Sequence, residues 1–247
     1  MGDGVREGSE DPVAFQAVEA ILGEEGQVVT GNWSTLTHEE RAQIEAAVHA
    51  AELRTSAEIV PMIVKQSALY REARHRAGLV LALLVLTTLL TIESAWLPWG
   101  WHAANAGWLV AATMLAYGIG VLAGTWPVVI RFLTSRERMH QKVQLRAERA
   151  FAQHGIALTR ERTGLLLMVS LLERQVYVLA DQSLRQAVSS DEWNTVVAVI
   201  VERLKAHDLV GGLCRGIEAS GVFLARACPP GKGDNPNELP NEVIQDA

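Results

Sequence analysis

One long apolar stretch, residues 77–130, dominates the hydrophobicity pattern of the chain. Glu93 is the only Asp, Glu, Lys or Arg within it, and Pro98 interrupts it near the middle. A membrane-spanning helix needs about 20 mainly apolar residues, so the stretch is long enough for two. A buried helical core in a soluble protein would instead need shorter, amphipathic helices. The pattern therefore predicts a transmembrane hairpin with spans over about 77–96 and 106–130.

Basic residues flank this stretch on both sides and are absent from its central turn. They are Lys65, Arg71, Arg74 and Arg76 before it, and Arg131, Arg136, Arg138 and Lys142 after it. Short loops rich in Lys and Arg stay on the cytoplasmic side of a membrane. We therefore expect both flanks in the cytoplasm, and the tryptophan-rich turn facing outward. The first thirty residues show no signal-peptide pattern, so the first span would act as the insertion signal.

Small residues recur at every fourth position of the second predicted span. They are Ala112, Ala116, Gly120 and Gly124, and Gly78 and Ala82 offer a matching face on the first span. Small residues at this spacing let helix backbones approach closely. Such a stripe can close the hairpin or join the chain to a second copy or another membrane protein. It can also arise by chance, because Ala and Gly are common in spanning helices.

Outside the apolar stretch, helical and strand-like patterns occur on both sides of it. Thr37 and Glu40 form a capping box for a predicted helix that ends near Arg54. A β-rich run at 59–64 follows, in which Pro61 indicates a bulge or an edge position. The elements expected after the stretch are a helix at 136–154, strands at 165–169 and 176–180 joined by a turn, and helices at 190–206 and 210–226.

Both ends of the chain differ from this pattern. Residues 1–34 carry seven acids against the single base Arg6 and form an acidic tail, in which 12–22 can make a short helix. Residues 229–247 are rich in proline and poor in apolar residues, so a disordered tail is expected there.

The two folded segments, 36–70 and 136–227, are each incomplete. The first offers a single strand, whose backbone groups would have no ladder partner. Two spans return the chain to the same side of the membrane, so the segments can meet. We therefore expect the strand at 59–64 to share a sheet with the strand at 165–171. The predicted fold class is an α/β domain interrupted by a transmembrane helical hairpin.

The folded segments resemble the TPM domain family. The residues that carry the resemblance are Thr55–Val60 followed by Tyr70, and Thr163–Leu171 followed by Glu173–Val176, Asp181 and Trp193. The family includes plant thylakoid proteins linked to photosystem II repair, an animal acetylcholine-receptor modulator and many bacterial membrane proteins. The resemblance covers roughly 36–227 and points to the bacterial branch in which a membrane hairpin splits the domain.

This resemblance has several implications for fold and function. It implies a small α/β/α sandwich, anchored in the bacterial inner membrane with the domain and both termini in the cytoplasm. It also implies the acid phosphatase activity and the bound calcium described for some members of the family.

Few residues offer the chemistry of a metal-dependent hydrolase. The sequence has no GxxxxGK[ST] or HExxH motif, and its seven histidines lack metal-ligand spacing. Asp181 follows a predicted strand, where α/β proteins often place ligands, although its side chain can instead cap the next turn. Glu58 opens the first strand and would approach Asp181 if their strands were neighbours; it can equally be solvated or pair with a helix. These two acids are the predicted ligands for Ca²⁺ or Mg²⁺, and no catalytic residue is assigned.

The remaining chemical candidates are weaker. Glu173 and Arg174 are expected at an exposed hairpin tip, and Ser170 has no visible general base. Cys214 and Cys228 lack CxxC spacing and are expected to be free thiols in a reducing compartment. The net charge of −6 and the lack of basic–aromatic interleaving argue against nucleic acid.

The sequence leaves two functions open. The first is a membrane-anchored, non-enzymatic module that binds, or helps assemble or maintain, other membrane proteins. The second is a metal-dependent acid-phosphatase-like hydrolase. The scarcity of site chemistry favours the first.

Overall fold

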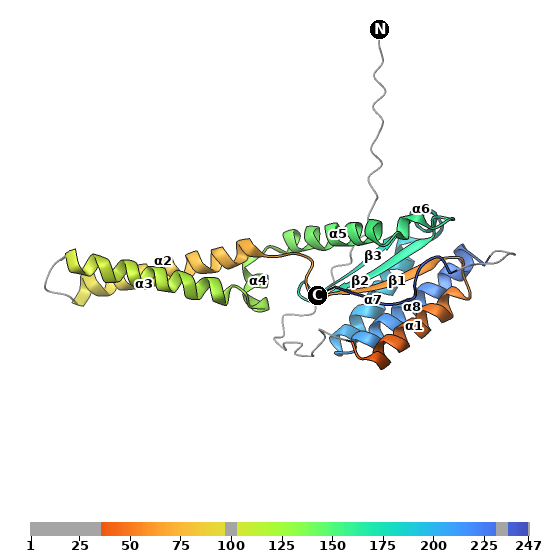
Figure 1. Ribbon diagram of the computed structural model, residues 1–247, viewed down its shortest axis with the longest axis horizontal. Coiled ribbons are helices and arrows are strands. Elements are labelled where there is room, and N and C mark those ends of the chain that lie inside the picture. The colour runs from red at the N-terminus through yellow and green to blue at the C-terminus, as the bar shows by residue number, and fades with distance from the viewer. Residues whose placement is uncertain (1–35, 97–102, 231–236, 247) are drawn as a thin grey trace, which may run out of the picture. The chain divides into compact units, whose positions relative to one another are not determined.

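The computed structural model describes residues 36–96, 103–230 and 237–246 (Figure 1). The chain divides into two compact units. The α/β unit contains the described residues up to Gln66 and from Val143 onward, and the helical unit contains Ser67–Lys142. The acidic tail, with its predicted short helix, and most of the tryptophan-rich turn lie outside the described residues, as does the side chain of Glu93.

A four-stranded sheet forms the centre of the α/β unit. Its strands are β1 (Glu58–Val64), β2 (Gly164–Ser170), β3 (Gln175–Ala180) and β4 (Ile244–Asp246), in the order β3-β2-β1-β4. β1 lies parallel to both β2 and β4, and β3 is antiparallel to β2. β1 precedes the apolar stretch and β2 follows it, so the predicted pairing of the two segments is confirmed.

Helices cover both faces of this sheet (Figure 1). They are α1 (His38–Glu52), α5 (Arg136–Gln153), α7 (Ser190–Lys205) and α8 (Leu209–Ala227), with the short α6 (Gln182–Ala187) and the 3-10 turn η1 (Ile156–Leu158). Side chains alternate across a strand, so Leu165 and Leu167 enter the core that α1, α7 and α8 close. Leu166 and Met168 enter the opposite core, which includes Val143 of α5. The unit is thus a mixed α/β fold.

Local capping signals locate the starts of α1, α7 and α8. Thr37 and Glu40 form the predicted capping box of α1. A second box, Ser189 with Glu192, begins α7, so the cap lies one residue before the predicted Ser190. Asp208 caps α8 through the backbone N–H of Gly211.

The predicted disordered tail over 229–247 is wrong for its described end. Residues 244–246 form β4 and pair with Met62–Val64 of β1. The sequence pattern did not indicate β4, because its three residues pair with a strand about 180 positions earlier in the chain. Pro61 lies just beyond this short ladder, where its missing N–H leaves no bond unmade. The prediction that Pro61 lies at an edge therefore holds for the part of β1 that precedes the ladder with β4.

Two long helices form the helical unit and pack along each other (Figure 1). They are α2 (Arg71–Trp96) and α3 (Ala103–Ala123), followed by the shorter α4 (Pro127–Leu133). Gly120 lies against Gly78, and Gly124 lies against Arg74, so the two helices are antiparallel. Ala82 and Ala116 are also buried. Part of the small-residue stripe therefore faces the partner helix of the same chain.

The second predicted span is not one straight helix. α3 ends at Ala123, and the axis of α4 is turned by 102° from that of α3. Pro127 is the physical cause, because it lacks an N–H and its ring clashes with the preceding turn; it occupies the first turn of α4 instead. Because residues 106–130 are almost uniformly apolar, the hydrophobicity pattern did not predict this break.

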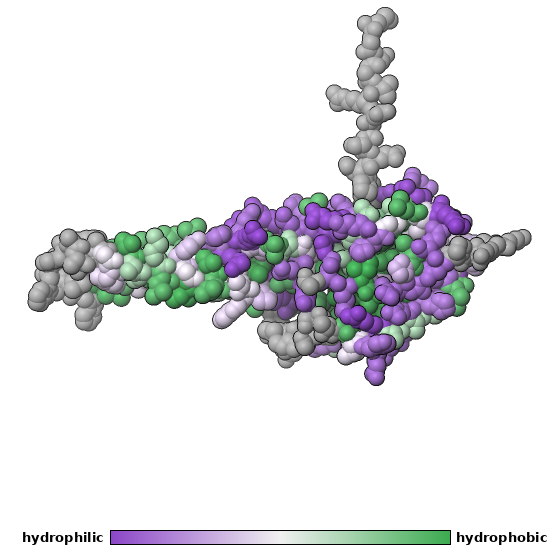
Figure 2. Space-filling view, viewed as in Figure 1, coloured by the Kyte–Doolittle hydropathy of each residue, from purple (hydrophilic) through white to green (hydrophobic). Residues whose placement is uncertain are grey.

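The outer surface of α2 and α3 is strongly apolar (Figure 2). Exposed large side chains include Leu79, Leu83, Leu84, Val110, Met114, Leu115, Ile119 and Leu122. By length and composition, residues 71–92 of α2 could cross a membrane. The described part of the chain holds a second candidate only if the bent pair 107–123 and 127–133 counts as one span.

Candidate binding site along strand β1

Glu58, one of the two predicted metal ligands, lies buried at the start of β1. Its carboxylate accepts hydrogen bonds from the backbone N–H groups of Glu238 and Leu239, each at 3.3 Å. Burial raises the pKa of Glu58 above its ordinary value, and the two N–H donors act against that shift. Its observed partners therefore belong to the polypeptide backbone of the C-terminal segment, residues 237–246.

Glu52, which the sequence patterns did not single out, hydrogen-bonds to the same edge of β1. One carboxylate oxygen accepts the N–H of Ile59 at 2.9 Å, in the place where a neighbouring strand would supply a carbonyl. Burial raises the pKa of Glu52 to about 7, and the nearby charge of Glu58 adds to this rise. The side chain of Asn241 in the C-terminal segment also hydrogen-bonds to Glu52.

The spacing of α1 contained a signal for the burial of Glu52. Ile44 and Val48 are fully buried, and Glu52 follows them at the same four-residue interval, which places it on the same helix face.

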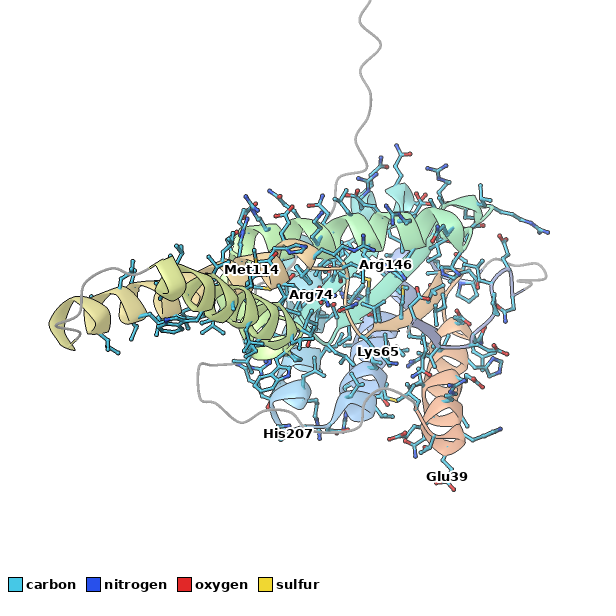
Figure 3. All side chains as sticks on the ribbon, turned by 60° about the vertical axis from the view of Figure 1, so that its left-hand side comes forward. Glu39, Lys65, Arg74, Met114, Arg146 and His207 are labelled. Carbon is cyan, nitrogen blue, oxygen red and sulfur yellow. The ribbon has the colours of Figure 1, made fainter. Side chains whose placement is uncertain are left out.

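Ion pairs and apolar contacts fix the C-terminal segment at both of its ends. Glu238 accepts from the backbone N–H of Arg160 at 3.0 Å, and the Arg160 side chain lies 3.5 Å from the same carboxylate. At the other end, Arg146 of α5 (Figure 3) pairs with Asp246. Between these ends, Val243 is buried in the core beneath α1.

Asp181, the second predicted metal ligand, has a different set of partners. It is the N-cap of α6, where its carboxylate accepts the N–H of Gln182 at 2.7 Å. The Nε of Arg162 lies 3.2 Å from both carboxylate oxygens. The capping role considered for Asp181 is therefore observed, together with an ion pair.

The strands that carry Glu58 and Asp181 are not neighbours. Glu58 stands opposite Gly164 of β2, and Asp181 donates its N–H to the carbonyl of Gly164 from the other side. β2 thus separates the two acids, and adjacent strands are about 4.8 Å apart. Among the described residues, no group of three or more His, Cys, Asp or Glu side chains is placed to hold a metal ion.

The prediction of an exposed Glu173 is wrong. Its side chain is buried and accepts a hydrogen bond from the hydroxyl of Ser170, which is also fully buried. The turn between β2 and β3 folds Glu173 back over the end of β2, with Arg174 at positive φ. Ser170 therefore has an acidic neighbour that the sequence did not reveal, but no exposed surface through which a substrate could reach it.

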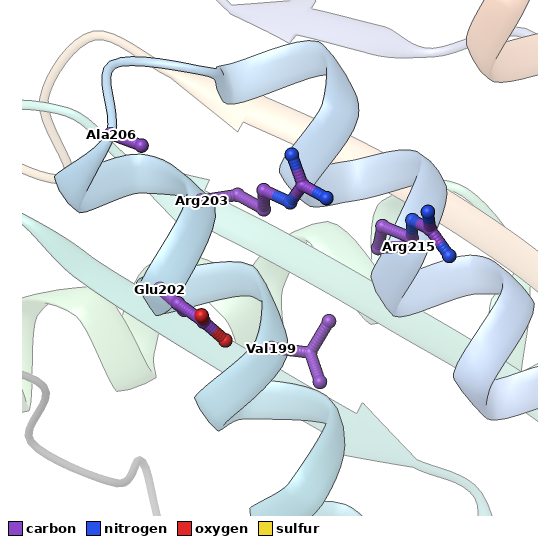
Figure 4. A pocket seen from close by; sticks show the side chains of 5 residues that line it. All are labelled: Val199, Glu202, Arg203, Ala206 and Arg215. Atoms are coloured by element: carbon purple, nitrogen blue, oxygen red, sulfur yellow. The ribbon is translucent and has the colours of Figure 1, made fainter.

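A surface cavity of about 420 Å³ lies between α7 and α8 (Figure 4). Its lining residues are Val199, Glu202, Arg203, Ala206 and Arg215. Arg203 is 3.6 Å from Asp208, and Arg215 is 3.6 Å from Glu218. Both arginines thus already have acidic partners, and an acid lines the cavity as well.

Comparison with known proteins agrees with this fold. Residues 126–222 match the model of the TPM domain family. The BA42 protein from the psychrophilic bacterium Bizionia argentinensis, solved by NMR, has a similar structure, with a TM-score of 0.55 at 21% identity over 87% of this chain and 99% of that one. The search of curated proteins found no significant match. The region from α4 to α8 is therefore similar in sequence to the TPM domain, and the fold is similar to that of BA42.

Proposed function

We propose that this protein is a membrane-anchored, TPM-like module that acts by binding other proteins and not by catalysis. The observation that carries the proposal is the edge of β1. There Glu58 accepts the backbone N–H groups of Glu238 and Leu239, and two arginines pair with the acids of the C-terminal segment. These groups together bind both the backbone and the acidic side chains of a polypeptide segment.

Membrane anchoring is supported by the helical unit. α2 combines sufficient length with an outer surface of exposed leucine side chains. In water such a surface would be unfavourable, since large contiguous apolar patches usually mark interaction or membrane sites. The basic residues that flank α2 and α4 support the cytoplasmic side for the α/β unit.

Site-specific photo-crosslinking in the native membrane tests the binding function. A photoreactive residue at Lys65, at the end of β1, is compared with one at His207, which is exposed in the α7–α8 turn. We expect protein adducts from position 65 and few from position 207. Absence of adducts at both positions, together with Asp181-dependent hydrolysis of phosphate esters in Ca²⁺ or Mg²⁺, would favour the metal-dependent phosphatase instead.

A further inference from the structure

The outer edge of β1 is only partly covered by another strand. β4 pairs with Met62–Val64, whereas β1 begins four residues earlier, at Glu58. Along this edge the N–H of Ile59 is satisfied by a side chain, Pro61 has none, and the N–H of Lys65 reaches the carbonyl of Asp246 at 3.4 Å. Ile59 and Pro61 therefore lose no N–H hydrogen bond when a segment leaves this edge.

The segment that lies there forms only a short backbone ladder with β1 for its length. It contributes one three-residue ladder, and all three residues of β4 are partly exposed. Val243 is its buried anchor, and Leu239 and Ile244 pack at the margin of the other core. The residues that precede it, 229–236, include three prolines and two glycines.

From these features we infer that β1 is a strand-docking site, that residues 237–246 occupy it in cis, and that an extended segment of a partner protein takes their place. The inference rests on the proposed binding function and names its surface and its ligand. Addition of a strand to an exposed sheet edge gives affinity through backbone hydrogen bonds and specificity through alternate side chains.

The contacts of the cis segment define the chemistry of the partner. Arg160 and Arg146 each pair with an acid, at Glu238 and Asp246, so the ligand carries acidic residues eight positions apart. The cis segment bends at Leu239 and Glu242 and is a strand only over 244–246, so the ligand needs a strand conformation only near its second acid. Apolar side chains between them match the positions of Val243 and Ile244. The expected partner is thus an extended, acidic-ended, β-branched segment of another protein.

Peptide exchange in the full-length protein tests this inference. A protease site is placed within residues 231–236, the purified protein is cut there, and a fluorescent peptide of residues 237–247 is added. We expect saturable uptake of the peptide after cutting and at least tenfold weaker uptake before it. A peptide with Glu238→Lys and Asp246→Lys is the matched control and should bind at least tenfold more weakly than the native peptide.

Several results would overturn the inference. One is a cut protein that stays folded, keeps its own segment and takes up no peptide; another is equal binding of the charge-reversed peptide. If the cut protein unfolds, hydrogen exchange of the intact chain decides instead. The amides of Glu238 and Leu239 should then exchange at least a hundredfold faster than that of Leu167, and equal rates would refute an exchangeable segment. Photo-crosslinks found only at sites away from β1 would support the binding function but show that β1 is not the surface that carries it.

Discussion

The packing of α2 against α3 allows a prediction from two glycines that lie two positions apart on the same helix. A Cβ at Gly120 would stand 2.7 Å from the Cα of Gly78 and 2.8 Å from the carbonyl oxygen of Ala77. A Cβ at Gly118 would meet no atom within 4 Å. Gly120→Ala and Gly118→Ala therefore introduce the same methyl group on one helix, once into the interface and once into open space.

The expected difference follows from this geometry. Carbon atoms pack best about 3.5–4.0 Å apart, so at Gly120 the two backbones must separate by about 1 Å. Overpacking of this kind costs about 1–3 kcal/mol. The helix-propensity gain from Gly to Ala, up to about 1 kcal/mol, is shared by both variants and cancels in the comparison. Gly120→Ala should thus be about 1–3 kcal/mol less stable than Gly118→Ala.

Two measurements check this difference in detergent-solubilised protein. Unfolding of the helical unit by a rising fraction of SDS gives the stability of each variant. Spin labels at Leu79 and Ile119, both exposed, report the separation of the helices. Equal stability and equal distances in the two variants would show that Gly120 is not a close-contact position.

Three further predictions follow from other parts of the structure. Because the pKa of Glu52 is raised from 4.5 to about 7, chiefly by burial, its contribution to stability is full below about pH 4.5 and is lost as the pH rises through 7. Urea unfolding of the α/β unit should show this loss between about pH 4.5 and 7, and Glu52→Gln should reduce it. Ca²⁺ or Mg²⁺ should leave the melting temperature unchanged, since a site filled at 100 times its Kd would add roughly 2.7 kcal/mol; an increase that Asp181→Asn abolishes would contradict this. In intact cells, a membrane-impermeant thiol reagent should label a cysteine at position 100 but not one at position 30 in a background lacking Cys214 and Cys228, and the reverse pattern would invert the proposed topology.

Features set by short-range signals were accessible from the sequence. The capping box of α1 depends on Thr37 and Glu40, three positions apart, and the structure forms it as expected. The turn between β2 and β3 and the unbroken apolar run of β2 were recognisable for the same reason. The pairing of β1 with β2 followed from a topological argument, because a lone strand needs a partner.

Features set by distant contacts were not accessible. β4 is recognisable as a strand only because β1 lies beside it, and its three residues carry no strong local pattern. Glu52 and Glu173 are acidic residues at the end of a helix and in a turn, positions that usually face solvent. The spacing of α1 places Glu52 on the buried helix face, but its contact with the C-terminal segment, and the contact of Glu173 with the hydroxyl of Ser170, are not visible in the local sequence. The candidate binding site was thus missed except for Glu58.

A site that its own chain occupies imposes a quantitative demand on any partner. A segment joined to its site by a short linker has an effective concentration on the millimolar scale. If the cis segment bound with an intrinsic Kd of about 1 μM, the site would be free only about one part in a thousand of the time, and a partner would bind about a thousandfold more weakly than to an open site. A partner must therefore bind far more tightly than residues 237–246, or be concentrated beside the protein in the same membrane. The second condition suits the proposed membrane anchor, since a partner held in the same bilayer would be present at a high local concentration.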